Sequence, residues 1–436
     1  DPEYLLTLII FSLAVIGYVV YGGFKAVVWT DIMQGIIMFL GVAIMLILVL
    51  SQVGGLERAT RELHKMVPPK TCEAIFERTP ESPVGKILIK KGAWYKTNND
   101  MVFIVPSEST IIKEGANESS NVNAYLYENS KPKNLSKTSS AQIKSQKGYA
   151  YGENKKGVYL TAPGPDLKKG TGFLAIVTAL SFFIFWPFGG TGQPANMVRL
   201  MAFKNTQTLR RSIITVAFFY SFIYFCLVVI FCCGKVLMPG MEANADRVMP
   251  ELAALLSKNA GVPWLAGLLV AAPFAAIMSS VDSFILILSS SLVRDVYQRI
   301  NPNASERKLK SLSYMITLGV GILAVFAMMN PPQYLQDLII FASGGLAGCL
   351  LMPMALCLYW PRMTPNGAIA GMLGALIIHL GLTIIGFKMT GNFEPYDLLD
   401  LNPFIWDVIG SAILIVSVSL LGKNPHQGHT DPFFVD

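Results

Sequence analysis

The chain has 436 residues, of which 53% are hydrophobic and only 14% are charged, and its formal net charge is +7 at pH 7. Soluble domains usually carry about a quarter charged residues, so this composition excludes an ordinary soluble globular protein. The positive charge does not indicate nucleic-acid binding, because no stretch interleaves Lys and Arg with aromatic residues on a soluble face. The composition indicates a protein whose main partner is membrane lipid.

Nine long apolar runs follow one another along the chain. A run of ~20 apolar residues makes a helix that crosses the ~30 Å hydrocarbon layer. Backbone groups cannot stay unpaired in lipid, so these runs should be helices. We therefore predict an all-α polytopic membrane protein. The runs cover approximately residues 4–21, 24–52, 172–200, 211–234, 263–293, 311–329, 334–360, 365–387 and 404–421.

Basic residues fall in alternate loops between these runs, which is the pattern of cytoplasmic loops. We therefore expect a multi-pass protein of the plasma (inner) membrane, with an extracytoplasmic insert at 55–170 and a cytoplasmic C-terminus. The basic residues concerned are Lys25, Arg199, Lys204, Arg210, Arg211, Arg294, Arg299, Arg307, Lys308, Lys310, Arg362 and Lys423.

The first acid of interest, Asp31, follows the sequence "GGFKAVVWT". The pair Gly22-Gly23 is expected to break the chain at an inner loop. Two interpretations are then open. Either Thr30 or Asp31 caps the helix that follows, or Asp31 is an acid near an inner exit for an ion.

Residues 55–170 are polar and rich in Ser, Asn and Lys. Short alternating runs within 85–96, 100–108 and 157–163 predict strands between turns. A flexible segment is expected near 114–146. The insert is therefore predicted to be a small β-rich module, either a solvated insertion without chemistry or a cap that binds a partner or gates access.

The stretch "FFIFWPFGGTGQPANMVRLMAF", residues 182–203, places prolines and glycines inside an apolar run. Proline lacks a backbone donor and glycine is flexible, so a continuous helix is not expected here. Broken helices at membrane depth are buried or line a cavity, and in transporters they point half-helix ends at substrate and ions. The alternative is a proline kink with a packing role. The residues concerned are Pro187, Gly189, Gly190, Gly192 and Pro194.

The stretch "APFAAIMSSVDSFILILSSS", residues 272–291, carries two adjacent hydroxyls in apolar surroundings. On a helix the carbonyl of Ala276 lies beside the side chains of Ser279 and Ser280, at i+3 and i+4. Three neutral oxygens can therefore converge on a small hard cation such as sodium. The alternative is that both serines bond back to carbonyls of their own helix.

Asp282 is the only ionisable residue between Trp264 and Arg294. A charge at bilayer depth costs ~2.5–3.5 kcal/mol, so such acids face a wet cavity or a partner. Asp282 lies three residues after Ser279 and shares its helix face. It marks either an ion or proton path, or a packing contact through a hydrogen bond to a neighbouring helix.

Four stretches together resemble the sodium/solute symporter family. Within that family, some pieces are similar to pantothenate carriers and others to proline permeases. The resemblance covers most of the chain outside 55–170. The stretches are "YGGFKAVVWTDIMQG" (21–35), "GQPANMVRLMAFK" (192–204), "AAIMSSVDS" (275–283) and "LYWPRMTPNGAIAGMLGAL" (358–376).

This resemblance implies an inverted-repeat (LeuT-like) sodium symporter fold with an incomplete first repeat. Residues 1–54 then supply the last two helices of the first repeat. Residues 171–362 form the second repeat, with its broken helix at about 182–203. Residues 363–436 add two C-terminal helices and a cytoplasmic tail. The missing N-terminal helices are expected from an upstream segment or a partner chain.

The resemblance also implies residue roles. The sodium site takes the carbonyl of Ala276 and the hydroxyls of Ser279 and Ser280. The ion pathway takes Asp31, to which we add Asp282. Gly190 departs from the proline-type members, which have an aromatic residue there. The substrate-binding candidates are Trp186, Gly192, Gln193 and Pro194.

The predicted function is sodium-coupled symport, with sodium as the co-transported ion. A small organic solute such as a carboxylate, vitamin or amino acid would be taken up by alternating access. The alternative is a transport-inactive sensor or assembly subunit on a symporter scaffold, with the insert as its binding module. No catalytic residues are predicted, because the chain has no Walker loop, HExxH motif or Ser/His/Asp set. No metal site other than that for sodium is predicted.

Overall fold

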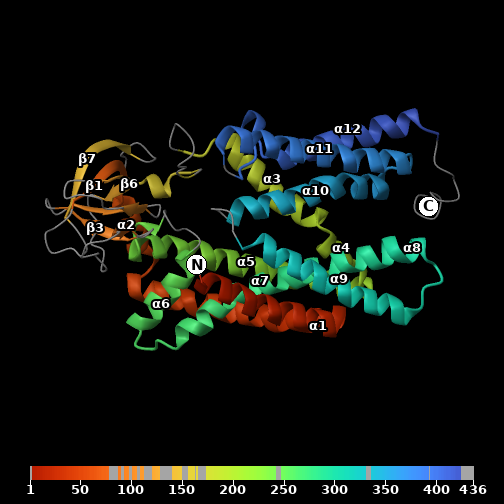
Figure 1. Cartoon of the computed structure of the whole chain (residues 1–436), viewed down its shortest axis with the longest axis horizontal. Helices are drawn as coiled ribbons and strands as arrows, with labels where there is room; N and C mark the ends of the chain where they lie inside the picture. The colour runs from red at the N-terminus through yellow and green to blue at the C-terminus, as the bar shows by residue number, and fades with distance from the viewer. Residues whose placement is uncertain are drawn as a thin grey trace. The chain divides into compact units, whose positions relative to one another are not determined.

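The structure, a computed structural model, describes residues 2–77, 87–89, 93–97, 101–105, 109–111, 120–127, 140–149, 156–162, 164, 173–241, 247–329, 335–391 and 393–423. Helices dominate this part of the chain (Figure 1). Within it, seven helices are long and apolar enough to cross a membrane. The protein is therefore a polytopic α-helical membrane protein, as its composition indicates.

The sequence predicts nine apolar runs, whereas the described residues form seven long helices. Two local features explain the difference. The first two runs form one helix, α1, which is kinked at Gly23, where the backbone leaves the helical region at φ 56° and ψ −156°. The third run forms α3 (Ile176–Gly192), whose 17 residues are fewer than a full span requires. The seven long helices are α1 (Pro2–Val53), α5 (Thr206–Leu237), α7 (Leu265–Ser290), α9 (Glu306–Ala327), α10 (Leu335–Tyr359), α11 (Pro365–Thr390) and α12 (Pro403–Leu421).

Several helix ends follow from side-chain caps in the sequence. Ser305 accepts a hydrogen bond from the backbone N–H of Lys308 at the start of α9, and Thr364 accepts one from Gly367 at the start of α11. Such caps satisfy backbone donors that have no partner within the helix. Gly391 adopts the left-handed conformation that ends α11. Hydroxyl and glycine signals therefore set these boundaries.

The shorter helices lie between the long ones. Two of them, α2 and α6, occupy stretches that the sequence pattern assigned to the insert and to a loop. After α7 the chain continues through a π-helical segment, η4, into a single turn. The bounds are α2 (Leu56–Lys65), α4 (Pro194–Met201), α6 (Val248–Asn259), η4 (Ser291–Tyr297) and α8 (Gln298–Ile300).

The chain packs as two compact units. The first contains residues 1–35, 176–216 and 275–436, and the second contains residues 36–175 and 217–274. These limits follow packing and do not coincide with the four segments 1–54, 55–170, 171–362 and 363–436. The assignment of 1–54 and 171–362 to two inverted repeats stays a prediction.

In the second unit, the described residues between 70 and 149 form seven strands. Five of them form a sheet in the order β3-β4-β6-β1-β7, and β2 pairs with β5. All neighbouring strands are antiparallel, with Cys72 of β1 opposite Ala124 of β6. The strands are β1 (Lys70–Glu77), β2 (Ile87–Ile89), β3 (Trp94–Lys96), β4 (Val102–Ile104), β5 (Ser109–Ile111), β6 (Ser120–Tyr127) and β7 (Ser140–Tyr149).

Two expectations for this region need correction. The run at 157–163 is not a strand, because Gly157 adopts a left-handed conformation and starts a 3-10 turn, η2 (Val158–Leu160). The segment near 114–146 contains β6 and most of β7, so it is not flexible throughout. Its remaining residues lie outside the described part of the chain.

The sheet is built on alternating side chains. Residues Cys72, Ala74 and Phe76 of β1 point to one buried face, where they pack against Phe103 and Leu126. Alternation of this kind places one face of a strand in a core. Gly240, after α5, lies so close to Trp94 of β3 that a β-carbon would come within 2.2 Å of the indole. The helical and sheet parts of this unit are therefore in direct contact.

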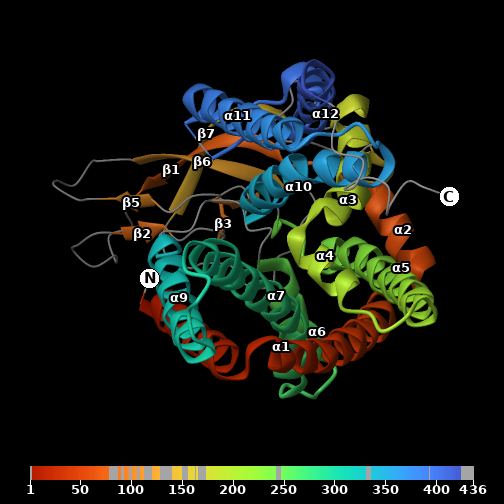
Figure 2. The same cartoon turned by 90° about the vertical axis from the view of Figure 1, so that its right-hand side faces the viewer.

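In the first unit, α10, α11 and α12 pack against one another, and α3 packs against α10 (Figure 2). Their buried contact includes Phe185, Ala347 and Phe404. A second buried cluster joins α1 and α7 through Val15, Val19, Val27 and Ile285. This second cluster positions the candidate site.

Candidate functional site

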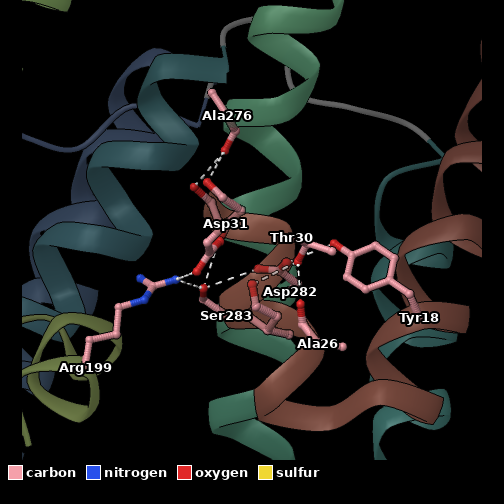
Figure 3. A network of polar contacts seen from close by, with 11 residues as sticks. Tyr18, Ala26, Thr30, Asp31, Arg199, Ala276, Asp282 and Ser283 are labelled. Carbon is pink, nitrogen blue, oxygen red and sulfur yellow. Dashed lines mark hydrogen bonds and ion pairs between the residues drawn. The ribbon is translucent and has the colours of Figure 1, made fainter. Parts of the chain in front are cut away.

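The sodium-site candidates lie together on one turn of α7, at the position of Ala276 in Figure 3. The Ser279 hydroxyl donates to the carbonyl of Ala276 over 3.0 Å, and the Ser280 hydroxyl donates to the same carbonyl over 3.2 Å. Three oxygens thus meet at one point. The hydroxyls bond back to their own helix, as the alternative interpretation expects. Each hydroxyl oxygen also has two lone pairs. Rotation about the Cβ–Oγ bond can direct one of these lone pairs away from the backbone of its own helix.

Asp282, one turn further along α7, is fully buried. Its Oδ2 accepts a hydrogen bond from the Tyr18 hydroxyl over 2.9 Å, and its Oδ1 accepts one from Ser283 over 3.3 Å. Burying a carboxylate without donors costs several kcal/mol, so these bonds explain how an acid is tolerated here. Asp282 therefore makes a packing contact between α1 and α7.

Asp31 forms an ion pair that the sequence did not predict. A guanidinium N–H of Arg199 on α4 donates to Oδ2 of Asp31 over 2.7 Å. The same nitrogen lies 2.5 Å from the Ser283 hydroxyl, which itself donates to the carbonyl of Ser279 over 2.7 Å. Asp31, Arg199 and Ser283 thus form one network that reaches the sodium-site turn (Figure 3).

The capping interpretation of Thr30 and Asp31 does not hold. Both residues lie within the continuous second half of α1, well after the kink at Gly23. The Thr30 hydroxyl donates to the carbonyls of Ala26 and Val27. A capping side chain accepts from backbone N–H groups ahead of it, whereas this one bonds backward. Asp31 instead forms the ion pair with Arg199, and its place near an inner ion exit stays a prediction.

Two buried oxygen atoms beside this network have no hydrogen-bond partner within the described part of the chain. They are Oδ1 of Asp31 and Oε1 of Gln34. The two residues are three positions apart on α1, so their side chains lie on the same face. An unsatisfied buried acceptor costs about 1–3 kcal/mol. A cation or water at this position would remove that cost.

The broken helix is interrupted at a single residue. α3 continues through Pro187 and Gly190 to Gly192, and α4 begins at Pro194. Between them Gln193 is extended, with φ −78° and ψ 129°. The amide of Asn196 donates to the carbonyl of Gly190 over 2.6 Å, which satisfies a backbone group at the break. Asn196 was not among the sequence candidates.

The four substrate-binding candidates occupy different environments. Gly192 is buried against α10, and a β-carbon there would lie 2.9 Å from the carbonyl oxygen of Ala347. Close helix packing therefore explains this glycine. Trp186 is 51% exposed, and Gln193 and Pro194 are half-buried. None of the described side-chain hydrogen bonds joins these residues to the network on α7.

Sequence reasoning missed three members of the network. From the sequence, Arg199 is only one of several basic residues in a predicted loop. Ser283 carried a weak signal, because it lies four residues after Ser279 and follows Asp282. Tyr18 carried none, since it is one of 16 tyrosines and lies 264 positions from its partner.

Known proteins resemble this chain over much of its length. A sodium/pantothenate symporter of Haemophilus influenzae is 27% identical over 389 residues, which cover 89% of this chain and 60% of that protein. One of Escherichia coli K12 is 25% identical with the same coverage. A sodium/proline symporter of Escherichia coli K12 is 31% identical over 275 residues, which cover 60% of this chain and 50% of that protein. The chain thus spans at most about 60% of these curated relatives.

A family comparison gives the broader classification. Residues 2–97 and 153–375, more than half of the chain, match the sodium:solute symporter family. The match extends into the insert as far as residue 97, so the likeness is wider than the stretch outside 55–170 that the motifs indicated. With its membrane-spanning helices and its motifs on α1, α4 and α7, the chain belongs to the sodium:solute symporter family.

Proposed function

We propose that this chain is the core of a sodium-coupled symporter for a small organic solute. The observation that carries the proposal is the meeting of the Ala276 carbonyl with the Ser279 and Ser280 hydroxyls on one turn of α7. Hard cations bind oxygen ligands, and a neutral oxygen set suits a monovalent ion better than a divalent one. The names of its relatives support sodium as that ion.

The polar network next to this turn gives the ion a route in this proposal. Ser283 donates to the carbonyl of Ser279, and Arg199 joins Ser283 to Asp31. A sodium ion that leaves the serine turn would meet the unpaired Oδ1 of Asp31 and Oε1 of Gln34. Asp31 is thus the pathway residue, whereas Asp282 holds α1 to α7 through Tyr18.

The solute site is proposed at the break between α3 and α4. Proline and pantothenate, the solutes in the relatives' names, both carry a carboxylate. The N-terminus of a helix favours negative charge, and α4 begins at Pro194 directly after the break. Trp186 and Gln193 would contact the rest of the solute, while Gly192 lets α3 approach α10 closely. A small carboxylate is the solute class that this arrangement fits.

Alternating access in a LeuT-like fold would couple the two sites. One sodium ion that moves inward across 100 mV releases ~2.3 kcal/mol. That energy supports about 50-fold accumulation of the solute. Opening the inner side would part Asp31 from Arg199, because this ion pair joins α1 to α4. The insert would lie outside and the C-terminus in the cytoplasm of the plasma membrane.

The test is uptake of labelled proline and labelled pantothenate by the complete protein in proteoliposomes. Uptake of one of them should require an inward sodium gradient, and a potassium gradient should not replace it. Replacing Ser279→Ala and Ser280→Ala should reduce that uptake more than 10-fold. Ser212→Ala is the matched control, because its hydroxyl makes the same backward bond at an exposed position of α5. Solute uptake that does not depend on the sodium gradient would contradict the proposal. Solute binding without any uptake would favour the sensor alternative.

A further inference from the structure

A cavity of about 560 Å³ lies at the kink of α1. Its walls come from the Gly22–Gly23 backbone, the end of α7 with η4, and the first turns of α9. Its lining shares no residue with the Ala276–Ser283 turn or with the break at Gln193. The cavity is therefore a separate place in the first unit, at the ends of membrane-spanning helices.

Positive charge is in excess around the cavity. Three cations and one acid line it: Arg294, Arg307, Lys310 and Glu306. Arg294 binds Glu306 with two nitrogens, over 3.3 and 3.2 Å, so the acid is already paired. In the described part of the chain, neither Arg307 nor Lys310 forms an ion pair with an acid, and both are exposed. Within that part of the chain these two cations have no acidic partner and can bind an anionic ligand, while Nζ of Lys310 also lies 5.8 Å from the centroid of the Tyr314 ring.

The rest of the lining is apolar or aromatic. Leu286, Val293 and Leu309 form part of the wall, and Tyr21 stands at the rim with 86% of its surface exposed. Tyrosine is enriched at the membrane interface, where one end of the side chain is wet. A free phosphate would gain nothing from such a wall. A phospholipid presents a charged phosphate and apolar chains together, which matches both parts of the lining.

Two unusual backbone features line the cavity. Gly23 adopts φ 56°, which other residues rarely take, and it contributes no side chain to the wall. Val293 and Arg294 lie in the π-helical segment η4. Such segments are rare and are frequent at functional sites. Neither feature belongs to the sodium or solute site.

We propose that this cavity binds the headgroup of an anionic phospholipid. Arg307 and Lys310 hold the phosphate, and the acyl chains leave past Tyr21 and Phe24 along the apolar helix surfaces. Basic pockets between membrane helices bind anionic headgroups in this way. The inference does not depend on sodium transport, because it concerns a different cavity and a lipid ligand.

The test is lipid binding to the purified complete protein by native mass spectrometry. Dioleoyl phosphatidylglycerol and dioleoyl phosphatidylcholine are titrated separately. The wild type should bind phosphatidylglycerol more tightly. The double variant Arg307→Gln plus Lys310→Gln should weaken that binding on the order of 25-fold, from about 5-fold per cation. The variant Arg307→Lys should retain it, which separates loss of charge from loss of fold.

The matched control removes two other exposed cations, Arg210→Gln plus Arg211→Gln, at the start of α5. This control should leave phosphatidylglycerol binding unchanged. Equal losses in both double variants would overturn the proposal, because they would indicate general surface charge. Equal affinity for the two lipids would overturn it as well. Displacement of phosphatidylglycerol by millimolar inorganic phosphate would show a free-anion site and would also refute a lipid site.

Discussion

Arg199 on α4 binds Asp31 on α1 over 2.7 Å, although the two residues are 168 positions apart in the chain. The ion pair joins the helix that follows the break to the helix that follows the kink. The same guanidinium reaches Ser283 on α7. Three helices of the first unit are therefore tied together at one basic residue.

Separating this pair should reduce transport more than stability. The Asp31 and Arg199 side chains are 22% and 40% exposed, so solvent screens their attraction. We expect Asp31→Asn or Arg199→Gln to change the free energy of unfolding by about 1 kcal/mol. Each should lower sodium-dependent uptake by the complete protein at least 10-fold. Because the two residues act as a unit, sodium-dependent uptake by the double variant should be no lower than uptake by the less active of the two single variants.

Thermal unfolding and uptake are measured for all three variants, with Arg211→Gln as the control for loss of an exposed cation. If the uptake losses of the two single variants add in the double variant, the residues act independently and the coupled role is wrong.

Sequence signals located some features of this site and not others. The motif on α7 could be predicted because its residues lie within one helical turn, where spacing alone fixes which groups meet. The contacts of Asp282 with Tyr18 and of Asp31 with Arg199 could not, because they depend on how distant helices pack. Spacing carries no information on such pairs.

Local chemistry also limited the prediction of helices. Pro187 and Gly190 suggested an interruption anywhere in 182–203, whereas the structure interrupts the helix only at Gln193. A proline removes one donor, and a helix passes through it where neighbours satisfy the freed carbonyl. The short helices α2 and α6 were missed although Leu252 and Leu256 are buried four residues apart. Polar residues on either side of this pair make the apolar spacing hard to recognise in the sequence.

Removing the Tyr18 hydroxyl should destabilise the contact between α1 and α7. Tyr18→Phe takes away the donor to Oδ2 of buried Asp282 and leaves the packing of the ring. An unsatisfied buried acceptor costs about 1–3 kcal/mol. The midpoint of thermal unfolding in detergent should fall. Tyr21→Phe is the matched control and should have no effect, because Tyr21 is exposed. An unchanged midpoint for Tyr18→Phe would mean that water or another donor replaces the hydroxyl.

A second buried pair should be important for the stability of the C-terminal helices. Nδ1 of His379 on α11 lies 2.7 Å from Oδ2 of Asp407 on α12, and its Nε2 lies 2.9 Å from the carbonyl of Phe341. Both side chains are buried. His379→Ala leaves a buried carboxylate without its partner and should cost about 3–5 kcal/mol.

The double variant His379→Ala plus Asp407→Ala should lose much less stability than the two single variants together, because no unpaired charge remains. His64→Ala, at an exposed histidine, is the control. Thermal unfolding provides the measurement. Additive losses would show that the two residues contribute only through packing.

Cys72 in β1 should resist thiol reagents at neutral pH. Its side chain is 2% exposed, and its thiol lies 3.5 Å from the carbonyl of Ala124. Burial raises the pKa of this thiol to about 11. The thiolate is the reactive form, so about 0.1% is reactive at pH 8, and labelling should rise about tenfold per pH unit below pH 11.

Maleimide labelling followed by peptide mapping checks this prediction for each cysteine separately. Exposed Cys357 serves as the internal comparison. Denaturant should make Cys72 fully reactive. Rapid labelling of Cys72 in the folded protein at pH 7 would place β1 at a surface and contradict the sheet core.

The most direct test of the sodium site is binding of ²²Na⁺ to the purified complete protein at equilibrium. We expect saturable binding that Ser279→Ala plus Ser280→Ala reduces at least 10-fold, while Ser212→Ala leaves it unchanged. Undiminished ²²Na⁺ binding by the double serine variant would show that the ion is held elsewhere and would contradict the assignment to α7.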